Sequence, residues 1–381
     1  MFYSPLKTKK PSLNEGFFIL IGLTHRRIQK SIKIVYKVSV IRRTKHASTA
    51  TCTLPIYMGF LMTEPNSISC TQLAETYNIS HDSVNRFLER EDYTPHDLYQ
   101  EAIQHIDNNK LIVSIDDTVL DKPYSQHMDL VSYFWSGKHH RSVKGINLIT
   151  LYATDQNGQN IPINFRIYDK SEGKTKNDYF MDMLSEVLSW GAKIQFITGD
   201  SWYSSTANLK TIRKHGIRFM FGIDCNRKVS PEKGQWFQLR LLPDFHQGQV
   251  VWLKDFGFVQ LFKTQLKEQQ RFYIVYQDED DLLSFEGFHE LHSSHWKIEQ
   301  YHRVIKQVCH IEKFQVRRSK LILNHIFSAL MAYVEIQKKQ FERTFENVYR
   351  WQKNLFRPII KDFIDDFILD KNHLLPQRIY K

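Results

Sequence analysis

Three acidic residues lie where carboxylates commonly do chemistry. Asp116 follows the apolar run Leu111–Ile115, Asp200 comes soon after a second apolar run, Ile194–Ile197, and Glu299 lies inside a helix-like segment. Cutting a phosphodiester without a covalent intermediate requires an activated water and a stabilised leaving oxygen, and two divalent ions about 4 Å apart supply both. Mg²⁺ prefers oxygen ligands such as carboxylates. Three acids that meet in space would suit this chemistry, whereas an isolated acid at a strand end is more often a turn or cap residue.

Strand-like and helix-like runs alternate around these acids. The sequence predicts three strands, a helix, a strand, a helix and a strand, in the order Leu111–Ile115, Asn147–Ala153, Ile161–Tyr168, Asn177–Trp190, Ile194–Ile197, Thr206–His215 and Arg218–Ile223. This order is typical of an α/β fold with a mixed sheet of ribonuclease H type. Short strand-like runs at 236–242, 250–255, 258–263 and 272–276 then occupy the segment 226–285, which predicts a β-rich insertion before the helix that contains Glu299.

A pair of short helices is expected over Thr71–Arg90. Asn78 supplies turn chemistry between them, and Ser80 is a suitable N-cap for the second helix. The spacing fits a helix-turn-helix, whose second helix would present Asn85 and Arg86 outward to DNA, together with His81 and Asp82. A plain helical hairpin fits the same short pattern.

The net charge of +11 is concentrated at the N-terminus. Residues 1–50 hold 11 of the 52 Lys and Arg and one of the 41 acids, which gives +10. The remaining 41 basic and 40 acidic residues give +1. Such an arm suits a polyanion through counterion release. A solvated tail upstream of a later start, at Met58 or Met62, is the alternative.

Composition restricts the class of protein further. No run approaches the roughly 18 apolar residues of a membrane span. The four cysteines include no CxxC pair, so reduced thiols in a cytosolic protein are expected and no zinc site is indicated. No glycine-rich phosphate loop is evident, so ATP is not implied.

Three blocks of the chain, within roughly residues 50–340, resemble the DDE transposases of bacterial insertion sequences. The likeness is to the insertion-sequence-four family, which carries a β-strand insertion. Its first Asp is followed two residues later by Thr or Ser, so Asp116-Asp117-Thr118 favours Asp116 as a ligand, with Asp117 as the alternative. GDSWYSS (199–205) is similar to the second block.

The family's third block is Tyr-x2-Arg-x3-Glu-x6-Lys. Glu299 and Lys306 keep the spacing, whereas His292 and His295 stand at the Tyr and Arg positions. On a helix, the residues at 295, 299, 302 or 303, and 306 share one face. A protonated His295 with an ordinary pKa near 6.5 would contact phosphate more strongly at low pH, and Arg303 could share that role.

The resemblance implies a chemistry and its partners. Asp116, Asp200 and Glu299 would hold two Mg²⁺ or Mn²⁺ ions, one DNA strand would be cut at the element end, and the freed 3′-hydroxyl would attack target DNA. Double-stranded DNA, a homodimer on paired ends and a bacterial cytoplasmic, nucleoid-associated location are implied. The expected DNA contacts are Lys306, Arg303, His295, Arg86, Asn85, Arg317 and Arg318. Trp252 or Trp236 in the insertion would stack on a flipped base or, alternatively, pack in a core.

Six segments are therefore expected: a basic N-terminal arm (1–50), a helical DNA-binding region (51–108), the first part of the catalytic core (109–225), the β-rich insertion (226–285), the third-carboxylate helix (286–320) and a helical C-terminal region (321–381). Two other functions fit the same features. One is a sequence-specific DNA-binding regulator whose core no longer cuts, and the other is a stand-alone nuclease of the same fold.

Overall fold

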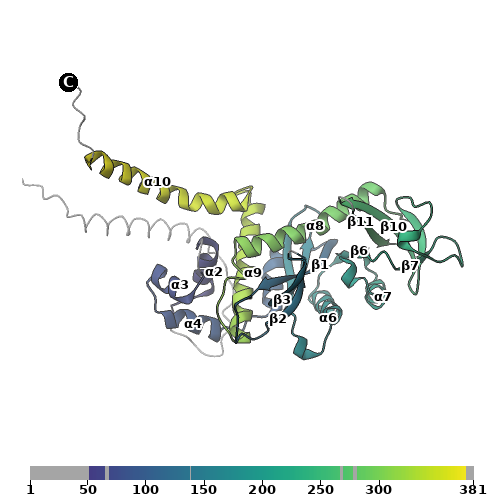
Figure 1. Cartoon of the computed structure of the whole chain (residues 1–381), viewed down its shortest axis with the longest axis horizontal. Helices are drawn as coiled ribbons and strands as arrows, with labels where there is room; N and C mark the ends of the chain where they lie inside the picture. Colours follow the sequence, from purple (N-terminus) through teal and green to yellow (C-terminus); the bar gives the residue numbers. More distant parts are fainter. Residues whose placement is uncertain (1–50, 65–67, 138, 267–268, 278–280, 375–381) are drawn as a thin grey trace, which may run out of the picture. The chain divides into compact units, whose positions relative to one another are not determined.

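The computed structural model describes residues 51–64, 68–137, 139–266, 269–277 and 281–374 (Figure 1). The basic arm at 1–50 lies outside the described residues, so its expected role stays a prediction. The chain divides into two compact units, and the larger is Arg42–Glu346. Helix α10 (Val348–Leu374) belongs to the other unit. No helix in the described part of the chain combines the length and apolar character that a membrane span requires.

Helices and strands alternate much as the sequence predicts. The α-helices of the larger unit are α2 (Leu54–Thr63), α3 (Cys70–Tyr77), α4 (His81–Arg90), α5 (Pro95–Ala102), α6 (Lys176–Ser189), α7 (Thr206–Lys214), α8 (Phe285–Gln307) and α9 (Ser319–Phe341). The strands are β1 (Leu111–Asp121), β2 (Ser132–Ser136), β3 (Arg141–Thr154), β4 (Asn160–Ile167), β5 (Ile194–Gly199), β6 (Arg218–Ile223), β7 (Lys228–Ser230), β8 (Phe237–Gln238), β9 (Gln249–Leu253), β10 (Gly257–Leu266) and β11 (Gln269–Tyr276).

The strands form one mixed sheet in the order β2-β3-β1-β5-β6-β11-β10-β9-β7-β8, with β4 also paired to β3. The pairing of β1 with β3 and of β3 with β4 is antiparallel, whereas β5 runs parallel to both β1 and β6. This is the ribonuclease H-like arrangement that the order of elements predicts. It sets the carboxyl end of β5 beside the middle of β1, where Ile115 lies opposite Gly199.

The strands of the β-rich segment extend the central sheet. Phe272–Tyr276 of β11 pairs antiparallel with Phe219–Ile223 of β6, and β10 and β9 follow. The short strands expected at 250–255, 258–263 and 272–276 are present, whereas only Phe237–Gln238 of the expected strand 236–242 is extended. The insertion therefore continues the backbone hydrogen bonding of the core.

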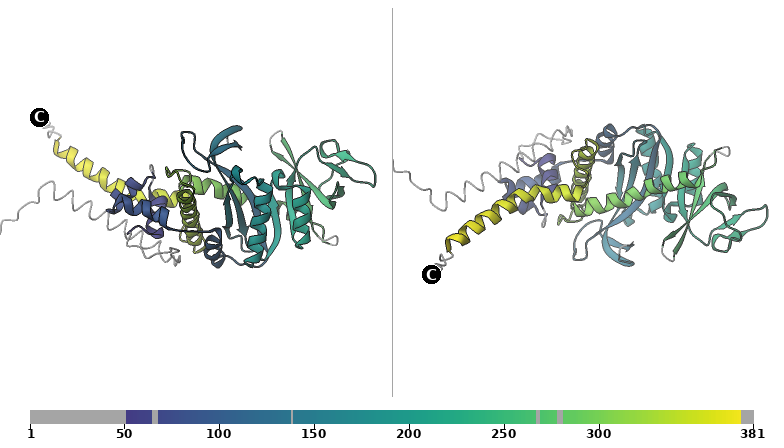
Figure 2. Two further views of the ribbon diagram at one scale, coloured as in Figure 1. Left: turned by 90° about the horizontal axis from the view of Figure 1, so that it is seen from below. Right: turned by 90° about the horizontal axis from the view of Figure 1, so that it is seen from above.

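Helices α6 and α8 cover opposite faces of this sheet. Successive strand residues point to opposite faces, and β6 shows it. Met220 joins the apolar cluster that contains Phe288 and Leu291 of α8, whereas Phe221 contacts Phe180 of α6. Figure 2 shows α6 and α7 in front of the strands from below and α8 in front of them from above. Neighbouring residues of β1 therefore face different helices.

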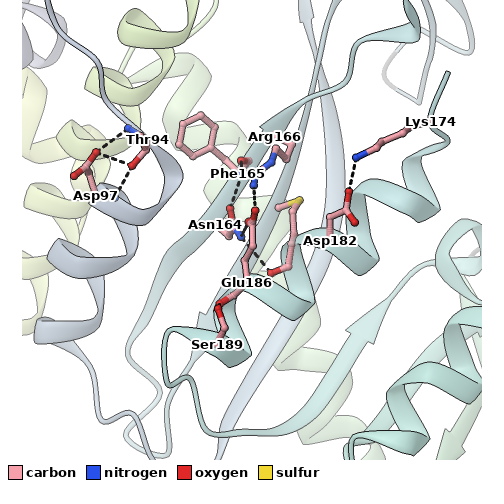
Figure 3. Close-up of polar contacts among 10 residues, drawn as sticks. Thr94, Asp97, Asn164, Phe165, Arg166, Lys174, Asp182, Glu186 and Ser189 are labelled. Carbon is pink, nitrogen blue, oxygen red and sulfur yellow. Dashed lines mark hydrogen bonds and ion pairs between the residues drawn. The ribbon is translucent and has the colours of Figure 1, made fainter. Parts of the chain in front are cut away.

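Buried polar contacts fix α6 on β4 (Figure 3). The Asn164 side chain donates to Glu186 Oε2 at 3.0 Å and to the Met183 carbonyl at 3.2 Å, and Arg166 pairs with Glu186. Thr175 and Asp178 form a capping box at the start of α6, which satisfies free backbone N–H groups there. The first turn of α6 is therefore fixed, and it positions Lys176 against the sheet.

The expected helix pair at 71–90 is present as α3 and α4. Asn78 adopts a left-handed conformation with φ 52°, and the Ser80 hydroxyl accepts from the Ser83 N–H. Val84, Phe87 and Leu88 are buried. The Asn324 side chain of α9 donates to the Leu88 carbonyl at 2.7 Å, so α4 is anchored to the same unit as the sheet.

Candidate metal centre

Asp116 lies midway along β1. The apolar run Leu111–Ile115 predicts that Asp116 lies at the end of a strand, but β1 continues to Asp121 because it pairs with β3 over 112–121. The parallel partner β5 stops earlier, with Ile115 opposite Gly199. Asp116 follows Ile115 in β1, and Asp200 follows Gly199, the last residue of β5. The strand register therefore places these two acids next to each other.

One face of α8 lies along β1 and β5. The Ser114 and Thr198 hydroxyls are 2.8 Å apart, and Thr198 Oγ1 is 3.2 Å from His295 Nδ1. Glu299 lies one turn and His302 two turns further along α8. His302 Nδ1 is 3.6 Å from Asp116 Oδ2. The helix face predicted from the sequence is therefore docked on the sheet.

Asp116, Glu299 and His302 form a compact group of oxygen and nitrogen donors. One ligand atom from each lies within 4.8 Å of the others. Loss of water by burial raises the pKa of Asp116 well above its ordinary value, and the charges of Asp200, Asp117 and Glu299 raise it further. All these effects disfavour the negative charge of Asp116, and a bound cation would stabilise that charge.

Asp200 completes the acidic group from the end of β5. Its Oδ1 accepts the Trp202 N–H at 2.9 Å, which caps the short turn 201–203. Although the side chain is exposed, neighbouring protein atoms that displace water raise its pKa to about 6, and the charge of Asp117 adds to this. The Trp202 N–H and Lys176 lower the pKa in part.

Asp117 points away from α8 and its carboxylate is occupied. Lys176 Nζ donates to Oδ2 at 2.7 Å, Asn147 Nδ2 donates to the same oxygen at 2.5 Å, and the Tyr203 hydroxyl donates to Oδ1 at 3.0 Å. The Lys176 and Asp117 side chains are 17% and 15% exposed. Asp116, by contrast, accepts a backbone N–H at Oδ1 and faces His302. The two neighbouring acids thus have different surroundings.

The donor set at Asp116, Asp200 and Glu299 fits a divalent cation. Carboxylate oxygens are the ligands that Mg²⁺ and Mn²⁺ prefer. The charges of Asp200 and Glu299 each raise the pKa of Asp116, so both acids interact electrostatically with Asp116. We therefore treat this group as the candidate metal centre.

The residues at the positions that bind phosphate in the resembling family are engaged within the chain. His292 Nε2 is 3.0 Å from the Tyr273 hydroxyl, and His295 contacts Thr198. Lys306 Nζ donates to the Val119 carbonyl at 2.7 Å and is 4.0 Å from Glu312. Arg303 is exposed, with its guanidinium 6.0 Å from the Trp296 ring. The phosphate contacts of these residues stay predictions, and Arg303 has the freest access to solvent.

His295 gives a pH prediction that differs from the expectation of an ordinary histidine. Burial lowers the pKa of His295 to about 4, and the charge of His292 lowers it further. The neutral form is then fully populated at pH 6 and pH 8, so protonation of this residue will not strengthen DNA binding between these values. We expect wild type and His295→Gln to show the same ratio of affinities at pH 6 and pH 8, at fixed salt. A gain at pH 6 in wild type alone would contradict this.

Other expected DNA contacts lie on the surface. Arg86 is exposed and 3.8 Å from Asp82, and Asn85 Nδ2 is 3.1 Å from His81 Nδ1. Arg317 is exposed, and Arg318 pairs with Glu89 of α4 at 2.7 Å. These residues face outward as predicted, and their contact with DNA is not tested by the geometry.

The two tryptophans of the insertion are partly exposed. Trp252 is 43% and Trp236 44% exposed, so packing inside a core, the alternative raised above, does not describe either ring. The Trp252 ring makes an edge contact with Phe258, with centroids 4.8 Å apart. Stacking on a base stays a prediction for both.

Sequence reasoning did not identify the polar partners around the acids. His302 was noted only as one position of the helix face, although its spacing of three residues from Glu299 was a usable signal. Lys176, Asn147 and Tyr203 carried none, because they meet Asp117 from three separate elements. Their convergence depends on the packing of α6 against the sheet.

A comparison with known protein families identifies the class of protein. The family model described as the transposase DDE domain matches residues 107–334, more than half of the chain. Among solved structures, the chain is similar to Marinitoga piezophila Argonaute in complex with a 5′-OH guide RNA and target DNA. The identity is 9% and the TM-score 0.21, over 66% of this chain and 34% of that one. The chain thus spans about a third of that protein, and a similarity this distant carries no argument.

No curated protein matches the chain significantly. The transposase match, however, spans β1, β5 and α8, the three elements that carry Asp116, Asp200 and Glu299. The chain therefore belongs to the family of transposases with a DDE domain.

Proposed function

We propose that this chain is an insertion-sequence transposase that cuts one DNA strand at the element ends and joins the freed 3′-hydroxyl to target DNA. The observation that carries the proposal is that Asp116 shares a compact donor group with Glu299 and lies next to Asp200 through the parallel register of β1 and β5, in a chain of the DDE transposase family. We place the chain in the insertion-sequence-four branch because the block around Glu299 keeps that branch's spacing.

Asp116, Asp200 and Glu299 would hold the divalent ions. When bound, such ions supply Lewis-acid activation of water and stabilisation of the leaving oxygen. The assignment of Asp116 rather than Asp117 is supported by the three donors that already occupy the Asp117 carboxylate. Asp117 would instead hold Lys176 beside the acids, where its positive charge lowers the pKa of Asp200.

Positioning of DNA would come from the chain's exposed cations and aromatic rings. Arg303 is near the metal centre in sequence and faces solvent, which suits a phosphate contact. The Trp202 ring is 62% exposed, two residues from Asp200, and Lys176 Nζ lies 5.5 Å from its centroid. A base beside the scissile phosphate could stack there. A homodimer on paired ends and a cytoplasmic location at the nucleoid belong to the same proposal.

The test is a two-step assay with supercoiled plasmid and labelled end DNA, with Mg²⁺, with Mn²⁺ or with EDTA. We expect metal-dependent nicking at the element end, followed by joining of the labelled 3′ end to the plasmid. Binding without nicking in either metal would support the regulator with an inactive core. Nicking without joining would support a stand-alone nuclease.

Helix α4 gives a separate prediction about recognition. If it enters the major groove, the double substitution Asn85→Ala and Arg86→Ala will weaken binding to end DNA by at least about tenfold, because each base contact contributes about 1–3 kcal/mol. Binding to unrelated DNA should fall less. Fluorescence anisotropy with both DNAs measures this.

Lys210→Ala, which removes an exposed cation of α7, is the charge-matched control. Equal losses on both DNAs would mean that α4 contacts only phosphate. An unchanged affinity would favour a plain helical hairpin.

A further inference from the structure

We propose that His302 is a nitrogen ligand of one of the divalent ions, so that the site is an Asp-Glu-His centre with a preference for Mn²⁺. This inference deepens the proposed function and rests on it. It adds a ligand to the three acids and assigns the site a metal selectivity.

The helix geometry brings His302 to the acids. Glu299 and His302 are three residues apart on α8, so their side chains project from the same face. Their donor atoms and one from Asp116 lie within 4.8 Å of one another. Metal–ligand bonds of about 2.0–2.2 Å separate adjacent donors by about 3–4 Å, so one ion would bind all three after side-chain movements of about 1 Å.

The surroundings of His302 leave its ring without an ordinary hydrogen bond at Asp116. Nδ1 is 3.6 Å from Asp116 Oδ2, which is beyond hydrogen-bond distance. The residue is 6% exposed, and its Nε2 has no partner among the described residues. Most buried polar groups are paired. A cation beside Asp116 would bind Nδ1, the nitrogen that has no hydrogen bond to this acid, and the buried Nε2 would then carry the proton of the neutral imidazole.

The charged groups that face His302 come from α8 and β1. On α8, Lys306 lies one turn away, with its ammonium held by the Val119 carbonyl, and His295 lies two turns back on Thr198. From β1, Asp116 faces the ring and Asp117 contributes negative charge. The negative groups therefore gather on the side of the ring that faces the sheet, where a cation would lie.

The mixed donor set determines the expected metal preference. Both ions suit carboxylates, but Mg²⁺ demands near-ideal octahedral oxygen coordination, whereas Mn²⁺ is a transition metal that accepts an imidazole nitrogen more readily than Mg²⁺ does. Removing the imidazole should therefore weaken Mn²⁺ binding more than Mg²⁺ binding. We expect the Mn²⁺ affinity of His302→Gln to fall by at least about tenfold, the lower bound for groups that only support a ligand.

A spectroscopic test reads nitrogen ligation directly. Full-length protein with one equivalent of Mn²⁺ is studied by electron spin echo envelope modulation. We expect ¹⁴N modulation in wild type, its replacement by a ¹⁵N pattern after labelling of histidine alone, and its loss in His302→Gln. His295→Gln is the matched control, an imidazole on the same helix that is held by Thr198, and it should keep the modulation. The labelled wild type needs no substitution, so misfolding of a variant cannot obscure the answer.

The outcomes separate the two proposals. Bound Mn²⁺ without nitrogen modulation would overturn His302 as a ligand and leave an all-carboxylate centre intact. Modulation that persists in His302→Gln and disappears in His295→Gln would transfer the role to His295. A chain that binds neither Mn²⁺ nor Mg²⁺ would overturn the metal centre itself, and with it the proposed function.

Discussion

Asp116→Asn, Asp200→Asn and Glu299→Gln will each reduce strand cleavage by at least about 10³-fold while the protein still binds end DNA. Each change removes an anionic oxygen at nearly constant shape, and a lost transition-state interaction of about 4 kcal/mol corresponds to that factor. The measurement is nicking of end-containing plasmid with Mg²⁺ and with Mn²⁺, together with DNA affinity. Asp182→Asn, an exposed acid of α6 that pairs with Lys174, is the matched control and should keep full activity.

The same variants should differ from wild type in stability, and the sign follows from Asp116. Its pKa is raised in the folded chain. Stability is therefore highest below the unfolded pKa of about 3.9 and is lost as pH rises through the folded value. Asn does not titrate, so metal-free Asp116→Asn should be more stable than wild type by about 1 kcal/mol or more at pH 7.5, with a smaller difference at pH 5.

Urea unfolding in EDTA at the two pH values measures this, and added Mn²⁺ should reverse the order by stabilising wild type alone. For the cleavage prediction, full nicking activity of Asp200→Asn would show that Asp200 does not belong to the metal centre. Equal stability of wild type and Asp116→Asn at both pH values would show that the acids do not repel one another.

The order of the elements was predictable, because apolar periodicity decides which segments become strands and helices. Arg218–Ile223 matches β6 residue for residue, and Thr206–Lys214 forms the expected helix. The extent of β1 was not predictable. The apolar run predicts a strand that ends at Ile115, yet residues 116–121 continue it because β3 supplies a partner as far as Asp121. Pairing between distant segments, which leaves no local signal, decided that length.

The site was predictable only as far as residue type and spacing reach. Asp200 and Glu299 follow from their blocks, but the difference between Asp116 and Asp117 does not, because both fit a strand that ends in acids. Alternation along β1 separates them, since one residue faces α8 and the next faces α6. That distinction depends on which helix covers which face, and it appears only in the folded chain.

The second large effect concerns Asp117, whose substitution should damage the fold before the chemistry. Asp117→Ala would leave Lys176 partly buried without its anion and would remove the acceptor used by Asn147 and Tyr203. Breaking one side of a buried pair costs about 3–5 kcal/mol, and the 15–17% exposure of this pair favours the lower end. We expect a loss of about 3 kcal/mol in urea unfolding, with Asp116→Ala as the neighbouring control that loses none.

A double-mutant cycle identifies the source of that loss. Lys176→Met fills similar space without a charge, so adding it to Asp117→Ala should recover part of the lost stability, because the uncompensated ammonium is gone. Additive losses would mean that the two side chains act independently. If Asp117→Ala were instead as stable as wild type and inactive in both metals, Asp117 would be the metal ligand and Asp116 its neighbour. Stability and cleavage measured on the same two variants therefore decide which of the adjacent acids binds the metal.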